Sequence, residues 1–264
     1  MDLGLHSKRA LVTGSTAGIG FAAAEALARE GAHVIINGRT RARVDEALAR
    51  LRSAVPNAKA EGIDADVSGA AGCARLISAF PEVDVLVNNM GIFEPKPFEA
   101  ITDQDWLRFF EANVLSGIRL SRHYVGGMRA RNFGRIVFVS SESGLQIPTE
   151  MIHYGMTKTA QLAVARGLAE MTSGTAVTVN SILPGPTKSE GVGDFVKGLS
   201  AQQGKSSDEV ERDFFKHARP SSLLQRFESP EEIAALTAFI ASPRASGVNG
   251  AALRVDGGVV RAIG

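Results

Sequence analysis

Short apolar runs rich in β-branched residues alternate along the chain with longer segments of helical periodicity. The runs cover residues 9–13, 33–37, 84–89, 134–140, 176–182 and 251–256, with a weaker one at 60–66. Each is almost continuously apolar, which indicates strands that are covered on both faces. Strands interleaved with helices predict a parallel sheet with right-handed crossovers, so we expect a doubly wound α/β fold of about seven strands.

Two of the helical segments carry boundary signals of their own. The segment 21–31 ends on a glycine, which suits a left-handed helix cap. The segment 229–242 begins with Ser229, Pro230 and Glu232, which fit an N-cap, a first-turn proline and a capping-box glutamate.

One long segment breaks this rhythm. No repeat, low-complexity tract or linker divides the chain, so we expect a single domain over residues 1–264. Residues 187–227 are rich in charge, glycine and serine and lie between two strand-like runs. An insertion at the carboxyl edge of a parallel sheet is typical of a helical or flexible substrate lid. A plain surface excursion fits the same composition.

Composition narrows the partners and the compartment. With a net charge of +1 and 22% charged residues, the chain gives no reason to expect nucleic acid. The single cysteine excludes an intramolecular disulfide framework and fits a reducing compartment. No apolar run reaches the length of a membrane span, and the first residues lack a signal-peptide pattern. We therefore expect a cytoplasmic protein that does not enter a membrane.

The first chemical motif is "LVTGSTAGIG", where Gly14, Gly18 and Gly20 follow a strand and open a helix. Glycines permit a tight turn and a close approach of the backbone to a pyrophosphate, and the helix N-terminus favours an anion. The motif therefore indicates a dinucleotide site. Taken alone, it is also compatible with a strand-to-helix turn that binds nothing.

The second motif is "YGMTK", which places Lys158 four residues after Tyr154 on one helix face. A phenol ordinarily loses its proton near pH 10, so a neighbouring ammonium is needed to bring its pKa down for acid–base work. Lys158 could also reach ribose hydroxyls. Without other signals, a packing tyrosine and a solvated lysine would explain the spacing equally well.

The full set of motifs resembles the short-chain dehydrogenase/reductase family. From Lys8 to about Val259, "TGSTAGIG", "DADV", "VNNMG", "ANV", "VSSESG", "YGMTK", "LPGPT" and "VDGG" occur in the order typical of that family, with its Rossmann-like fold. The resemblance implies four catalytic residues: a water-positioning Asn113, a substrate-binding Ser141 with Ser140 as its rival, the proton donor or acceptor Tyr154, and Lys158. The scattered histidines predict no metal site.

The resemblance also implies the cofactor contacts. They are Gly14, Ser15, Thr16, Gly18, Ile19, Gly20, Arg39, Asp66, Val67, Asn88, Asn89, Gly91, Tyr154, Lys158, Pro184, Gly185 and Thr187. The second predicted strand ends at Asn37 and Gly38 without a carboxylate, and Arg39 follows. Because a guanidinium suits a 2′-phosphate and a carboxylate suits a ribose hydroxyl, we expect NADP(H) rather than NAD(H). The glycine motif lacks a basic residue, which leaves NAD(H) as the alternative.

These observations favour an oxidoreductase that interconverts a small-molecule ketone and a secondary alcohol. A 3-oxoacyl-[acyl-carrier-protein] reductase is the second enzyme that fits. Sugar, polyol and steroid-like alcohols remain open as substrates. The non-enzymatic alternative is a nucleotide-binding sensor or scaffold. On the Tyr154 helix, Ala160, Ala163 and Gly167 would let another helix approach closely. The resemblance implies a homotetramer or homodimer through such a surface. Packing on the sheet is the other explanation.

Overall fold

The strands form one parallel sheet. The computed structural model describes residues 2–189, 192–193, 198, 200 and 204–263. Within them, seven strands pair in the order β3-β2-β1-β4-β5-β6-β7. Their bounds are β1 Arg9–Val12, β2 His33–Gly38, β3 Ala60–Asp64, β4 Val85–Asn88, β5 Gly134–Val139, β6 Val177–Pro184 and β7 Ala252–Val255. The predicted sheet is confirmed, including the weak run that forms β3.

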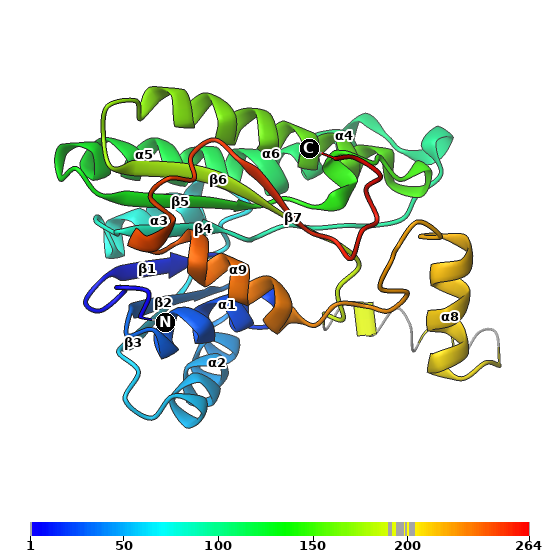
Figure 1. Cartoon of the computed structure of the whole chain (residues 1–264), viewed down its shortest axis with the longest axis horizontal. Coiled ribbons are helices and arrows are strands. Elements are labelled where there is room, and N and C mark those ends of the chain that lie inside the picture. Colours follow the sequence, from blue (N-terminus) through cyan, green and yellow to red (C-terminus); the bar gives the residue numbers. More distant parts are fainter. Residues whose placement is uncertain (1, 190–191, 194–197, 199, 201–203, 264) are drawn as a thin grey trace.

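Helices cover both faces of the sheet (Figure 1). Helices α1, α2 and α9 pack on one face, and α3, α5 and α6 pack on the other. The helix bounds are α1 Gly18–Arg29, α2 Arg41–Ala54, α3 Ala70–Ala79, α4 Asp103–Phe110, α5 Ser116–Ala130, α6 Ile152–Met171, α8 Ser207–His217 and α9 Pro230–Ile240. Both predicted helix segments are present, and α9 starts with the predicted capping box and proline.

The nearly continuous apolar runs are explained by this three-layer arrangement. Successive side chains of a strand point to opposite faces, and here both faces are buried. In β2, Val34 and Ile36 join the core under α1, α2 and α9, whereas Ile35 joins the core under α3, α5 and α6. The positions of such a strand are therefore mostly apolar on both faces.

Strand order creates a crevice at the carboxyl ends of the strands. Strand β1 pairs with β2 on one side and with β4 on the other, so the winding reverses direction there. Loops that leave adjacent strands in opposite directions open a gap, and ligands of doubly wound folds bind in it. The loops after β1, β4, β5 and β6 all begin at this edge.

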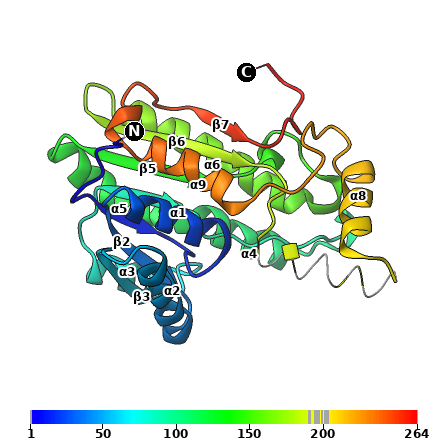
Figure 2. The ribbon, with the colours of Figure 1, turned by 60° about the horizontal axis from the view of Figure 1, so that its bottom comes forward.

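Helix α8 lies beyond the carboxyl ends of the strands and outside the two helical layers (Figures 1 and 2). Its first turn is a capping box formed by Ser206 and Glu209, and Phe215 anchors it among the rings of Phe214 and Phe227. This helix belongs to the segment 187–227 that the sequence marks as a lid. Residues 190–191, 194–197, 199 and 201–203 of that segment lie outside the described residues. No helix in the described ranges is long and apolar enough to cross a membrane.

Candidate active site

A cavity of about 900 Å³ opens where the loops after β4, β5 and β6 meet α8. Many of the predicted site residues share its wall. They are Ile19, Asn89, Gly91, Ser141, Tyr154, Lys158, Pro184, Gly185 and Thr187. Strand ends thus bring together residues that lie far apart in the sequence.

Two serines follow β5, and their side chains have different partners. The Oγ of Ser140 donates to the carbonyl oxygen of Lys158 at 2.8 Å, which ties β5 to α6. The side chain of Ser141 caps a short 3₁₀ turn, Glu142–Gly144, and forms a hydrogen bond with the hydroxyl of Tyr154. The geometry therefore favours Ser141 as the serine that can share a substrate oxygen with Tyr154.

The phenol of Tyr154 is not activated in the way the sequence predicts. Burial raises the pKa of Tyr154 to about 12, and the Ser141 hydrogen bond and the charge of Arg219 only partly oppose it. The Nζ of Lys158 lies 5.5 Å from the centroid of the Tyr154 ring, over the ring. The predicted lowering of the phenol pKa by Lys158 is thus not found in this geometry, because burial outweighs the nearby charges.

Lys158 is buried and has no carboxylate partner among the described residues. Its Nζ donates to the carbonyl oxygen of Val139 at 2.9 Å and to Oε1 of Gln161 at 3.3 Å. Removal from water disfavours the ammonium, and the pKa of Lys158 falls to about 7. At neutral pH this amine is therefore poised between its two protonation states.

Asn113 lies in a π-helical turn, Glu111–Leu115, which leads directly into α5. Such turns disrupt the regular hydrogen-bond ladder of a helix and often mark functional sites. The side chain of Asn113 is held by both backbone groups of Ile92 and by Thr157, at 2.7 to 3.0 Å. The backbone carbonyl oxygen of Asn113 accepts a hydrogen bond from Nε2 of Gln161 at 2.6 Å.

Gln161 therefore bridges the Nζ of Lys158 and the backbone carbonyl of Asn113. Sequence reasoning does not identify this residue. The available signal is its position three residues after Lys158, which puts both side chains on one face of α6. The hydrogen bond from Gln161 to the backbone carbonyl of Asn113 depends on how α6 packs beside the π-helical turn.

The glycine loop after β1 leaves no room for a side chain at Gly20. A Cβ on Gly20 would lie 2.5 Å from the carbonyl oxygen of Gly14 and 2.4 Å from Nδ2 of Asn89. Gly14 itself has a φ of +60°, which favours glycine. The Nδ2 of Asn89 donates to the carbonyl oxygens of Thr13 and Gly14 at 2.9 and 3.1 Å, so β4 holds this loop in place.

Two of the predicted cofactor contacts point into the protein. The Oγ of Ser15 donates to the carbonyl oxygen of Val12 at 2.7 Å and accepts from the backbone N–H of Asn37 at 2.9 Å. The Nδ2 of Asn88 donates to Ser121 of α5 at 3.1 Å. Neither residue is part of the described cavity walls. Their side chains support the loops that form the site.

A second, smaller cavity of about 470 Å³ lies at the ends of β2 and β3. Arg39, Asp66 and Arg75 line it, and Arg75 also pairs with Asp64 at 2.9 Å. Val67, by contrast, is buried in the core. This cavity therefore offers an exposed guanidinium beside the end of β2, as the sequence predicts, and a second arginine that the sequence analysis does not single out.

A basic side chain also reaches the glycine loop from elsewhere. Arg50 of α2 donates from Nη2 to the carbonyl oxygen of Thr16, and its guanidinium stacks over the ring of Phe21 at 4.4 Å. The sequence of the loop contains no basic residue, but the tertiary structure places one next to it.

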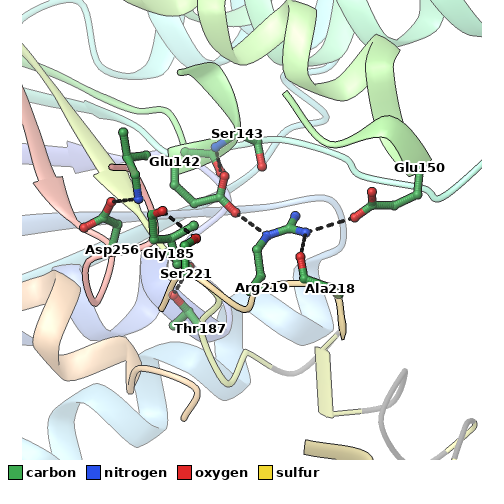
Figure 3. Close-up of polar contacts among 12 residues, drawn as sticks. Glu142, Ser143, Glu150, Gly185, Thr187, Ala218, Arg219, Ser221 and Asp256 are labelled. Atoms are coloured by element: carbon green, nitrogen blue, oxygen red, sulfur yellow. Dashed lines mark hydrogen bonds and ion pairs between the residues drawn. The ribbon is translucent and has the colours of Figure 1, made fainter. Parts of the chain in front are cut away.

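An ion-paired cluster of Arg219, Glu142 and Glu150, which we call the Arg219 clasp, lines the cavity (Figure 3). Arg219 follows α8 and is only 8% exposed. Its Nε donates to Oε1 of Glu142 at 2.9 Å, and its Nη1 donates to Oε1 of Glu150 at 3.1 Å. Glu142 directly follows Ser141, so the clasp joins α8 to the loop that carries this serine. Sequence reasoning identifies none of its three residues.

His153 precedes Tyr154 but has no contact with the cavity wall. Its ring packs 4.0 Å from the ring of Phe109 and 6.0 Å from that of Trp106, measured between centroids. Burial lowers the pKa of His153. This agrees with the structural role that the sequence analysis preferred. Across the described ranges, no group of three or more His, Cys, Asp or Glu side chains is arranged to hold a metal.

Comparisons with known proteins place this fold and site in a family. The sequence model described as Enoyl-(Acyl carrier protein) reductase matches residues 14–260. The uncharacterized oxidoreductase YvaG of Bacillus subtilis strain 168 is 47% identical over 263 residues, which cover 100% of both chains. The chain belongs to the short-chain dehydrogenase/reductase family.

Solved structures agree with this assignment. The L-sorbose reductase of Gluconobacter frateurii, complexed with NADPH and L-sorbose, superimposes with a TM-score of 0.92 at 31% identity and 100% coverage of both chains. A 3-oxoacyl (acyl-carrier-protein) reductase from Agrobacterium tumefaciens C58 with NADP bound gives 0.87 at 29% identity, covering 97% of this chain and 96% of that one.

Proposed function

We propose that the protein is an NADP(H)-dependent oxidoreductase that interconverts a ketone and a secondary alcohol. The observation that carries this proposal is the hydrogen-bonded pair of Ser141 and Tyr154 on the wall of a cavity, with the buried Lys158 behind it. Two hydroxyl groups converging on one point are suited to bind and protonate a carbonyl oxygen.

The described residues fit a dinucleotide phosphate. The glycine loop turns tightly, because a Cβ at Gly20 would clash with Gly14 and Asn89, and it opens α1 at the positive end of the helix dipole. Arg39 and Arg75 line the adjoining cavity, where no carboxylate ends β2. The NADPH in the L-sorbose reductase and the NADP in the 3-oxoacyl reductase support the same choice of cofactor.

The proposed mechanism assigns one task to each residue. A reduced nicotinamide, when bound, would supply the hydride that the carbonyl carbon accepts. Ser141 donates a hydrogen bond to the substrate oxygen, and Tyr154 transfers its proton to that oxygen as negative charge develops. Lys158 holds the ribose and returns a proton towards Tyr154, which its pKa of about 7 permits at neutral pH. Asn113 and Gln161 fix the position of Lys158.

The segment 187–227 fits a substrate lid in this proposal. Val210, Phe214 and Arg219, from α8 and the residues after it, form part of the cavity wall on the side away from the glycine loop. A segment in this position can admit a substrate and then exclude water.

A homodimer or homotetramer is also part of this proposal. Ala163 and Gly167 of α6 are exposed, and a Cβ on Gly167 would meet no atom within 4 Å. They therefore do not pack on the sheet, which supports a contact with another helix at these small residues. Light scattering tests this: the native chain should exceed the mass of a monomer, and Gly167→Arg should reduce it. A monomeric native chain contradicts the proposal.

A 3-oxoacyl-[acyl-carrier-protein] reductase remains the second candidate, supported by the description of the matching family model and by one structural neighbour. A panel of ketones, hydroxyketones and 3-oxoacyl thioesters, followed by the absorbance of NADPH, separates the two. Binding of NADPH, measured by its fluorescence, is the parallel readout. NADPH binding without turnover of any carbonyl compound would leave only the sensor reading.

A further inference from the structure

We propose that the Arg219 clasp selects an uncharged carbonyl compound with a hydroxyl group next to the carbonyl, and rejects one with a carboxylate there. This inference rests on the proposed function and refines its substrate class. It starts from the position of the clasp. Ser141 and Glu142 both line the cavity, and the charge of Glu142 acts on the hydroxyl of Tyr154, so a substrate oxygen bound there is exposed to the same charge.

The clasp has too many carboxylates to bind an anion. Glu142 and Glu150 both accept from Arg219, so its guanidinium is neutralised before a substrate arrives. The other cation on the α8 side of the cavity, Lys205, pairs with Asp213 at 2.5 Å. Away from Lys158, the described wall therefore carries three carboxylates against two cations, with His217 beside them. A substrate carboxylate would have to displace one of these partners.

Burial strengthens this discrimination. Glu142 and Arg219 are 3% and 8% exposed, so water screens their charges weakly. Breaking a buried ion pair leaves an uncompensated charge, which is costly. Binding of an anionic substrate would therefore be disfavoured in two ways. The second carboxylate would repel it, and an ion pair of Arg219 would be lost. An uncharged substrate leaves the clasp intact.

Acceptors for a hydroxyl group remain in the clasp. Arg219 occupies Oε1 of Glu142 and Oε1 of Glu150, and a carboxylate has about four acceptor sites on its two oxygens. Glu142 also accepts a hydrogen bond from Ser143, and its Oε2 is fully buried, so a substrate does not reach that oxygen. The carboxylate of Glu150 is accessible, since its side chain is 45% exposed. A hydroxyl donor next to the reacting carbonyl can therefore bind the Glu150 carboxylate, whereas a methyl group cannot.

Three small substrates of similar size test the proposal: hydroxyacetone, butanone and pyruvate, each assayed for kcat/KM with NADPH. Because a hydrogen bond to a charged group discriminates by at least about tenfold, hydroxyacetone should exceed butanone by that factor. Pyruvate should be the poorest of the three. Equal rates for hydroxyacetone and butanone, or pyruvate as the preferred substrate, would overturn the inference.

Two variants connect the preference to the clasp. Glu142→Gln and Glu150→Gln remove one negative charge each, and both should raise the kcat/KM for pyruvate relative to that for hydroxyacetone. Glu150 is partly exposed, so this variant should fold even if Glu142→Gln does not. Glu170→Gln is the matched control, because Glu170 pairs with Arg166 on the surface of α6 and should leave all three ratios unchanged. Unchanged ratios in the Glu150 variant count against the clasp.

Failure of this inference is distinguishable from failure of the proposed function. Butanone and hydroxyacetone could both be reduced without a preference between them, and Tyr154→Phe could lose turnover of both equally. In that case the proposed oxidoreductase function holds, but the clasp does not select the substrate. If no carbonyl compound is reduced while NADPH binds, the proposed function itself is wrong.

Discussion

The glycine loop and the Arg219 clasp border the same site, but they are built in different ways. The glycine loop uses backbone groups at the ends of adjacent strands, and Asn89 fastens it through two carbonyl oxygens. The clasp uses long charged side chains from residues 77 and 69 positions apart. One region is fixed by the register of the sheet, the other by the packing of α8.

This difference separates what is general in the site from what is particular. The glycine loop tolerates few substitutions, because a side chain at its glycines would clash or strain the backbone. Charged side chains can be exchanged without disturbing the sheet. We therefore expect substitutions at the strand ends to affect every substrate alike, and substitutions in the clasp to change the order of preference among substrates.

The largest effect on turnover is expected at Tyr154, which lines the cavity that both regions border. Tyr154→Phe removes the proposed proton donor but keeps the ring, so kcat should fall by about a thousandfold or more. NADPH binding, measured by fluorescence, should stay within a few-fold of the native value because the glycine loop is untouched. Retention of native turnover would exclude Tyr154 as the acid.

The cofactor side can be tested by reversing a charge. Arg39→Asp should lower the preference for NADPH over NADH by about a hundredfold, since a guanidinium–phosphate contact is replaced by repulsion. Arg41→Asp is the control, because Arg41 pairs with Asp45 on the surface of α2. Ratios of kcat/KM for the two cofactors provide the measurement. An unchanged ratio in Arg39→Asp would remove this residue from the proposal.

Gln161 offers a smaller and more specific effect. Gln161→Glu places a carboxylate next to the Nζ of Lys158 and should raise the pKa of that amine above about 7. The pH profile of alcohol oxidation should shift upward, with kcat at neutral pH reduced by about tenfold. Gln161→Met keeps the volume but removes both hydrogen bonds. It should lower kcat without an upward shift, whereas identical profiles for all three proteins would exclude a positioning role.

The smallest effect concerns stability rather than turnover. Glu228 is 3% exposed, and its Oε2 accepts from the backbone N–H of Gly185 at 3.0 Å. Burial raises the pKa of Glu228 from 4.5 to about 7. The folded protein therefore holds this proton more tightly than the unfolded chain. The resulting stabilisation is complete below the unfolded pKa and is lost as the pH rises through about 7.

Glu228→Gln cannot titrate, so the variant should gain on the native protein as the pH rises. The difference in free energy of unfolding should move in its favour by on the order of 2 kcal/mol between about pH 5 and about pH 8. Urea unfolding at several pH values measures this. A difference that is constant with pH would show that Glu228 does not carry the shift.

The fold was predictable because its constraints act position by position. Runs that must be apolar on both faces can be recognised without tertiary information, and even the interrupted run around Ile63 forms a strand. The capping box at Ser229 and Glu232 marks a helix start for the same reason. Prediction of a lowered pKa for the Tyr154 phenol was wrong, because burial raises that pKa and a spacing of four along the chain does not reveal burial.

The sequence by itself determined the doubly wound sheet, the family and the candidate residues Ser141, Tyr154 and Lys158, since local patterns and ordered motifs encode them. Only the tertiary structure decided that Gln161 bridges to Asn113, that Arg50 reaches the glycine loop, and that Arg219 meets two glutamates. Long side chains choose partners by proximity in space, and no spacing along the chain specifies that proximity.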